Sequence, residues 1–221
     1  MKIYPALLSD SREEIQQQVN RVLAEAPDIE TVQVDIIDGR FADNLTVTPA
    51  DLTGISWADL TIDFHLMTEE PLDYVYELID YKEELPIRAV IAQIERMSNI
   101  SHFLEDVQKN GLLPGVSIDL HTPLDELEAD HLRFIKIIQL MGIEAGFQGQ
   151  DFNPIVLNKI TQLVKACQTL EIELVIDGGI SEKTISSVAA AGATGVAVGS
   201  ALWNSSSISD TIDTLQQLSQ N

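Results

Sequence analysis

Three ionisable residues stand out because each lies near the end of an apolar, strand-like run. Asp35 lies in "TVQVDII", His65 in "IDFHLM" and Asp177 in "LVIDGG". A buried carboxylate without a partner costs several kcal/mol, so Asp35 needs a cation, a proton or a set of hydrogen-bond donors. Two carboxylates and an imidazole suit a hard-to-borderline divalent metal ion. The same groups could instead supply a general acid and a general base, and the residue types alone leave both alternatives open.

Two other reactive side chains have simpler interpretations. Asp38 precedes Gly39, a pair that is typical of a turn. Cys167 is the single cysteine, so an intrachain disulfide is excluded. Its setting in "LVKACQTL" indicates a helix face, where we expect a buried spectator thiol rather than a nucleophile.

Glycines concentrate late in the sequence, in "GFQGQ", "DGGI" and "VGSAL". Because the chain has only 13 lysines and arginines, a bound phosphate would depend on backbone N–H groups and helix dipoles, which glycine allows to approach closely. The sequence therefore predicts a phosphate site that includes Gly146, Gly149, Gly178, Gly179, Gly199 and Ser200.

Eight β-rich segments alternate with segments of helical period. Such alternation implies right-handed parallel β-α-β units, and eight units close most economically into a single (β/α)8 barrel, the TIM barrel of the α/β class. The alternative is an open doubly wound sheet, which would carry a glycine-rich turn after its first strand; "LLSDSREE" contains none. The predicted strands are 3–7, 31–36, 60–66, 89–94, 114–120, 134–140, 173–177 and 195–199. The predicted helices are 12–26, 71–81, 100–109, 154–169, 182–191 and 209–218, with Ser11, Thr68, Ser98 and Ser181 as N-caps and with short connections after the second and fifth strands.

A barrel would bring the candidate residues together. The carboxyl ends of the strands carry the chemistry in this architecture, and loops after the seventh and eighth strands commonly bind phosphate. Asp35, His65 and Asp177 end the second, third and seventh predicted strands, so we expect them in one mouth beside the late glycines.

Composition limits the partners and the compartment. The formal charge of −22 repels nucleic acid and anionic lipid over about 8 Å at physiological salt, so neither is an expected partner. A hydrophobic fraction of 45% and a mean hydropathy near zero argue against disorder. The 221 residues fit one domain. No long apolar segment suggests a signal peptide or a membrane span, so we expect a cytoplasmic protein.

The assembled motifs resemble those of the ribulose-phosphate 3-epimerase family over nearly the full chain. The similar stretches are "PALLSDS", "VQVDIIDGRFADNLT", "DFHLM", "GVSIDLHTP", "MGIEAGFQGQDF", "IDGGI" and "GATGVAVGSALW". The resemblance implies a barrel that uses a divalent metal ion such as zinc, manganese, iron or cobalt to invert C3 of a ketopentose 5-phosphate, and that often assembles into homo-oligomers. It implies further that Asp35 and Asp177 exchange protons on opposite faces of a cis-enediolate and bind the metal, with His65 as a third ligand.

This sequence also departs from the family pattern at positions near the implied site. The residues at these positions are Ala6, Gln33, Ile37, Gln93, Ala145 and Gln148. Gln33 replaces a histidine ligand and could bind a metal only through a neutral amide oxygen, a poorer donor to zinc than imidazole. We therefore expect a weakened metal site.

Three functions are compatible with these observations. The first is an active sugar-phosphate 3-epimerase acting on ribulose 5-phosphate or a related ketose phosphate. The second is a barrel that binds a sugar phosphate with lost or weak catalysis. The third is a related aldolase or decarboxylase, but such enzymes typically carry an Asp-x-Lys-x-x-Asp stretch, and the corresponding "DIIDGR" has no lysine.

Overall fold

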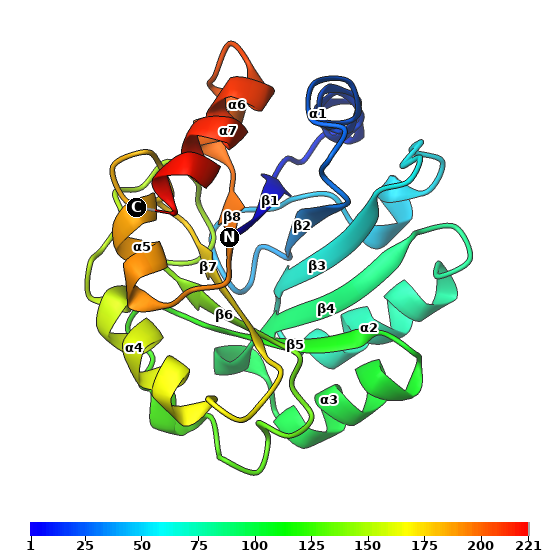
Figure 1. The fold of residues 1–221 in the computed structure, drawn as a ribbon. Coiled ribbons are helices and arrows are strands. Elements are labelled where there is room, and N and C mark those ends of the chain that lie inside the picture. Colours follow the sequence, from blue (N-terminus) through cyan, green and yellow to red (C-terminus); the bar gives the residue numbers. More distant parts are fainter. Residues whose placement is uncertain (221) are drawn as a thin grey trace.

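The computed structural model describes residues 1–220 and contains a closed barrel of eight parallel strands, ordered β1 to β8 as in the chain (Figure 1). This confirms the predicted (β/α)8 architecture. The strands are β1 (Lys2–Leu7), β2 (Thr31–Ile37), β3 (Thr61–Met67), β4 (Ile87–Gln93), β5 (Leu113–Ile118), β6 (Ile137–Met141), β7 (Glu173–Asp177) and β8 (Gly195–Val198).

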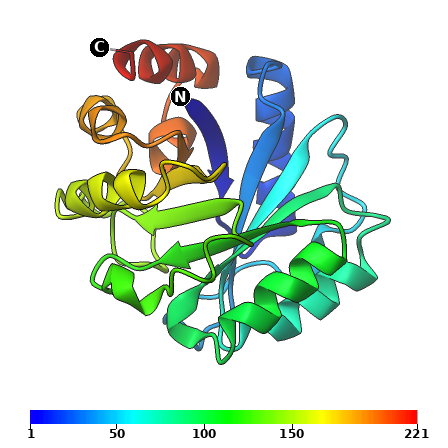
Figure 2. The same ribbon diagram turned by 60° about the horizontal axis from the view of Figure 1, so that its bottom comes forward.

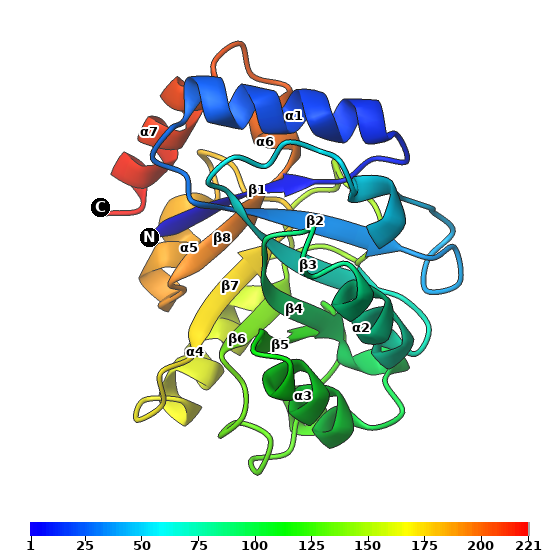
Figure 3. The ribbon, with the colours of Figure 1, turned by 90° about the vertical axis from the view of Figure 1, so that its right-hand side faces the viewer.

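Helices surround the barrel, and Figure 2 shows them on the outer side of the strands. The α-helices are α1 (Arg12–Glu25), α2 (Pro71–Asp80), α3 (Ile100–Lys109), α4 (Val156–Ala166), α5 (Ile185–Ala191), α6 (Ser200–Trp203) and α7 (Ile208–Leu218). Short 3-10 turns η1 (Pro49–Leu52) and η3 (Leu124–Glu126) follow β2 and β5, which confirms the predicted short connections, and η2 (Ile94–Arg96) follows β4. In Figure 3, α1 and α7 lie beside each other, and both pack against β1. No helix of residues 1–220 is both long and apolar enough to cross a membrane.

Several helix starts differ from the sequence-based expectation, and at only one of them, the start of α3, does another side chain provide the cap. Ser11 caps α1 as predicted, since its side chain accepts a hydrogen bond from the Glu14 N–H. Asn99 rather than Ser98 caps α3, by accepting from His102 N. Similarly, α2 begins after Glu70 rather than Thr68, and α5 begins after Thr184 rather than Ser181.

Alternation along the strands creates two separate cores. In β2, outward residues such as Val32 and Val34 pack beneath the helices, and the whole strand is buried. A much smaller apolar cluster fills part of the barrel interior and includes Ala6, Ile91 and Val175. Buried polar side chains, among them Gln33, Gln93 and Gln139, accompany this small cluster.

A charged network occupies the amino-terminal end of the strands, away from the candidate site. The pairing of β3 with β4 shifts register so that Ile62 pairs with Ile87 but Asp63 pairs with Ala89. This irregularity leaves Arg88 unpaired in the ladder, and such bulges redirect a side chain. Arg88 binds the buried Asp63 through both Nε, at 2.7 Å, and Nη2.

We predict that Arg88→Met lowers the free energy of unfolding by about 3 kcal/mol, because it leaves the buried Asp63 charge without a partner. Urea denaturation measures the change. Arg96→Met is the matched control: Arg96 and Glu69 form an exposed pair at 3.9 Å whose loss should cost less than about 1 kcal/mol. Adding Asp63→Asn to Arg88→Met should recover part of the stability. Equal losses in the two single variants would contradict the assigned importance of the buried pair.

Candidate active site

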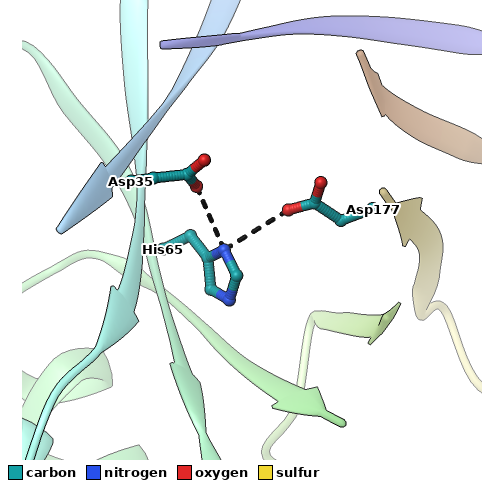
Figure 4. A group of neighbouring side chains, drawn as sticks. All are labelled: Asp35, His65 and Asp177. Atoms are coloured by element: carbon teal, nitrogen blue, oxygen red, sulfur yellow. Dashed lines mark hydrogen bonds and ion pairs between the residues drawn. The ribbon is translucent and has the colours of Figure 1, made fainter. Parts of the chain in front are cut away.

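Asp35, His65 and Asp177 meet inside the barrel although they come from three strands (Figure 4). Asp35 and His65 are direct partners in the register of β2 and β3, and Asp177 is the last residue of β7. His65 Nδ1 lies 3.1 Å from Asp35 Oδ1 and 3.3 Å from Asp177 Oδ2. All three residues are buried. The structure therefore brings the three predicted ligands together around one ring nitrogen.

The two carboxylates attract positive charge to this point. Burial alone would lower the pKa of His65, but its hydrogen bonds to Asp177 and Asp35 and their negative charges raise the pKa of His65 to about 9. Burial raises the pKa of Asp35, as does the charge of Asp177, whereas the hydrogen bond with His65 opposes the shift. A proton or a metal cation would therefore be stabilised between the carboxylates.

Two buried glutamine amides hold the carboxylates in place. Gln33 Nε2 donates to Asp35 Oδ1 at 2.9 Å and to Asp177 Oδ2 at 2.7 Å. Gln139 Nε2 donates to the same Asp177 oxygen at 2.9 Å. Sequence analysis did not identify Gln139; the available signal was a lone polar residue inside the apolar strand "IIQLM". These donors fix the orientation of both carboxylates.

The donor atoms fit a divalent cation. One oxygen from each carboxylate and the Nδ1 atom of His65 lie within 4.8 Å of one another. The Gln33 Nε2 atom contacts one oxygen of each carboxylate. A half-turn of this amide would put its oxygen in the place of Nε2, and the oxygen could then coordinate a cation. Carboxylate and amide oxygens with one imidazole suit a hard-to-borderline ion. This cluster is where a divalent ion could bind.

The cluster opens into a small inner cavity that adjoins an outer cavity of about 560 Å³. Asp35 and Asp177 line the inner cavity, together with Gly178 and Gly199. The residues shared by the two cavities are Gly149, Gly179, Ile180 and Ser200. Five of the six predicted phosphate-site residues therefore line the inner cavity beside the carboxylates, and three of these also line the outer cavity.

Gly146, the sixth, has a different environment. Its φ of +112° is accessible mainly to glycine, and an added Cβ would lie 2.4 Å from the Cβ of Ala42. Asn44 Nδ2 donates to the Gly146 carbonyl at 2.8 Å. Gly146 thus joins the loop after β6 to the loop after β2, and direct substrate contact stays a prediction for this residue.

Lys183 lines the outer cavity and was not identified from the sequence. It follows "DGGIS" in the connection between β7 and α5, and isolated surface lysines give no sequence signal. A basic side chain therefore lines the outer cavity, which adjoins the inner cavity beside the two carboxylates.

The departures from the family pattern gather around these features. Ala6 and Gln148 line the inner cavity, and Gln93 Nε2 lies 3.1 Å from His65 Nε2. The Gln148 amide packs against Gly199: a Cβ atom added at Gly199 would lie 2.7 Å from Gln148 Nε2. The replacements therefore alter both the cation-binding end and the glycine-rich wall.

Asp38 and Cys167 lie outside this arrangement. The Asp38 Oδ1 atom accepts from Arg40 N and Phe41 N, both at 2.9 Å, and Oδ2 accepts from Glu69 N at 2.7 Å. Burial opposes these backbone hydrogen bonds, but together they lower the pKa of Asp38. The predicted turn former is thus confirmed. Cys167 is the C-cap of α4 and is half-buried rather than buried as expected; burial raises the pKa of its thiol.

Solved structures share this fold at low sequence identity. A tryptophan synthase alpha-subunit variant from Pyrococcus furiosus aligns with a TM-score of 0.70 and 13% identity, covering 100% of this chain and 98% of that chain. 3-Hexulose-6-phosphate synthase from Salmonella typhimurium gives a TM-score of 0.67 and 12% identity, covering 100% and 99%. These likenesses support the barrel fold alone.

Sequence comparisons are more specific. The model of the ribulose-phosphate 3 epimerase family matches residues 2–203. The cytoplasmic isoform of ribulose-phosphate 3-epimerase from rice is 29% identical, with coverage of 98% of this chain and 93% of the relative. The Synechocystis enzyme of the same name is 30% identical, with coverage of 95% and 90%. The Escherichia coli enzyme is 27% identical, with coverage of 97% and 94%. Together with the barrel and its buried acids, these matches show that the chain belongs to the ribulose-phosphate 3-epimerase family of isomerases.

Proposed function

We propose that the protein interconverts ribulose 5-phosphate and xylulose 5-phosphate by inverting the configuration at C3. The observation that carries this proposal is the pair of buried carboxylates, Asp35 and Asp177, which converge on one histidine nitrogen and line the same cavity. Inversion through an enediolate needs one group to remove the C3 proton and another to return a proton to the opposite face. Two carboxylates from different strands, β2 and β7, would meet that requirement.

The proton-transfer roles follow from which oxygens are engaged. Asp35 Oδ1 and Asp177 Oδ2 face His65, whereas the second oxygen of each carboxylate is turned away from the ring (Figure 4). Each aspartate can thus contribute one oxygen to the cluster and one to substrate. A bound divalent cation would supply the positive charge that stabilises the enediolate oxygens. Gln33 would keep both carboxylates at a constant orientation during the transfer.

We propose manganese or iron before zinc as the preferred ion, with cobalt as a further candidate. His65 is the one imidazole of the cluster, and Gln33 can add only an amide oxygen. Such an oxygen-rich donor set favours harder cations than a site with two imidazoles does. The ligand set in this proposal is Asp35, His65 and Asp177.

The phosphate group of the substrate is proposed to lie in the outer cavity. Gly149, Gly179 and Ser200 line both the inner and the outer cavity, and their backbone N–H groups would bind the phosphate oxygens. The nearby Lys183 would add long-range attraction in a chain with 35 acidic residues. We assign the anchoring to the backbone and a secondary role to the lysine.

We extend the proposal to a cytoplasmic location, which the name of the rice relative and the unpaired Cys167 support. Assembly into a homo-oligomer stays a prediction, and light scattering measures the oligomeric state. The absence of a nucleic-acid or membrane partner also stays a prediction.

A second function has one specific observation in its favour. Gln33 presents Nε2 to both carboxylates, an arrangement that also suits a barrel that binds sugar phosphates with weak turnover.

We predict that Asp35→Asn abolishes exchange of the substrate C3 proton with solvent deuterium, because an amide cannot accept that proton. NMR of ribulose 5-phosphate in D2O with added Mn²⁺, Fe²⁺ or Zn²⁺, quenched and freed of metal before detection, measures the exchange. Asp38→Asn is the control; it retains the Oδ1 atom that accepts from two backbone N–H groups and should retain exchange. Exchange that persists in Asp35→Asn would contradict the role of Asp35.

Gln33→His should raise the affinity for a divalent cation about tenfold to a hundredfold, because imidazole is a better ligand than an amide oxygen. Competition with a coloured chelator measures this affinity. If poor metal retention limits turnover, kcat should rise as well. No gain for Zn²⁺ or Mn²⁺ would show that position 33 does not contribute a ligand.

Gly199→Val should weaken binding of inorganic phosphate and of ribulose 5-phosphate about tenfold, because the new side chain would collide with Gln148 and displace it into the cavity. Lys183→Met should change the same affinities less than about threefold, since an exposed charge is screened. Isothermal titration measures both variants, and their metal content should equal that of the parent. A larger effect from Lys183→Met would make the lysine the principal anchor.

A further inference from the structure

Gln93 is a buried glutamine whose amide has one unsatisfied end. It is the last residue of β4, and its side chain is 0% exposed. Gln93 Nε2 lies 3.1 Å from His65 Nε2, whereas Gln93 Oε1 is buried without a hydrogen-bond partner. An unpartnered buried oxygen costs about 1–3 kcal/mol, so this half-satisfied amide calls for a physical reason.

The contact restricts the protonation of the imidazole. His65 can accept a hydrogen bond from Gln93 Nε2 only if Nε2 of the ring carries no proton, and the ring proton then lies on Nδ1. Nδ1 is the nitrogen that faces Asp35 and Asp177. A cation bound there needs the Nδ1 lone pair, so the proton must then occupy Nε2 and needs a hydrogen-bond acceptor.

A half-turn of the Gln93 amide provides that acceptor. It would place Oε1 opposite His65 Nε2 and would end the isolation of this oxygen. The amide nitrogen would then move to the side of the side chain that Oε1 had occupied. Ser117 is the direct partner of Gln93 in the register of β4 and β5, and its hydroxyl is buried without a partner. The serine hydroxyl is thus an unpaired polar group on the strand next to Gln93.

We infer that Gln93 is a positioning residue whose amide rotates to hold the His65 proton on Nε2, so that Nδ1 is free to bind a divalent cation. This inference rests on the proposed cation site. The amide can serve every state of the ring, because it donates to Nε2 when only Nδ1 carries a proton and accepts from Nε2 when Nε2 is protonated, either in the imidazolium that the two carboxylates favour or when a cation binds Nδ1. Neither an apolar side chain nor a lysine could do both.

The test compares three substitutions in the full-length protein. Gln93→Met has similar length but no hydrogen-bonding atoms, and Gln93→Glu keeps an acceptor. Gln139→Met is the matched control, because Gln139 is equally buried and contacts Asp177 but has no contact with His65. Each variant is titrated with Zn²⁺ and Mn²⁺ against a chelator. ¹⁵N NMR of the metal-free and Zn²⁺-loaded proteins reports the protonated nitrogen of His65, with the signal assigned by its loss in His65→Gln.

Zn²⁺-loaded parent protein should show a slowly exchanging proton on His65 Nε2. Gln93→Met should bind both ions about tenfold to a hundredfold more weakly and should lose the slow exchange, whereas Gln93→Glu should keep both properties. Gln139→Met should leave the His65 signal unchanged even if its affinity falls.

The inference is overturned if Gln93→Met binds both ions within twofold of the parent, if its loaded His65 signal matches that of the parent, or if the parent binds neither ion. These results are independent of turnover. Cation binding that responds to Gln93 without any C3 exchange would overturn the proposed epimerase function alone. Intact C3 exchange with an unresponsive Gln93 would overturn only the present inference. If Gln93→Met fails to fold, the Nε2 proton of the loaded parent and the affinity of Gln93→Glu still decide the matter.

Discussion

The convergence of two buried carboxylates on one imidazole nitrogen is the constraint on which the rest of the site depends. Asp35 and Asp177 are both buried and both within 3.3 Å of His65 Nδ1. Two negative charges at such proximity require a compensating positive charge and several donors. In the closed barrel, side chains from β2, β3 and β7 converge in the interior. The amides of Gln33 and Gln139 supply the hydrogen-bond donors. The fold thus stabilises an arrangement that would be costly in most protein interiors.

The amides give this site its own chemical character. Where the family resemblance implies a histidine ligand, this chain has Gln33, and Gln93 and Gln139 add two further amides that contact His65 and Asp177. An amide presents either a donor or an acceptor after a half-turn, so the same side chains can satisfy the carboxylates when a proton occupies the centre and rearrange when a cation does. If a cation binds here, its binding would be coupled to the orientation of these amides.

The sequence was sufficient to predict the barrel and its central cluster, because both leave strong local signals. Strand-like runs alternate with helical ones, and an acid inside "QVDII" has few explanations other than a site. The bulge that redirects Arg88 could not be predicted, since it depends on the register between two strands. The partners of Gln139 were equally hidden, because the contact joins residues 38 positions apart. The predicted N-cap of α3 was wrong because two adjacent residues, Ser98 and Asn99, could both cap the helix.

The central claim is that one divalent cation binds between Asp35, His65 and Asp177, directly beside the substrate carbon. Anomalous diffraction from crystals grown with Mn²⁺ and a ribulose 5-phosphate analogue tests this claim most directly. The account predicts one strong anomalous peak bound by Asp35 Oδ1, Asp177 Oδ2 and His65 Nδ1, with the analogue between the peak and the glycine-rich wall. An analogue bound there without a manganese peak, while Gln33 Nε2 still bridges the two carboxylates, would contradict it.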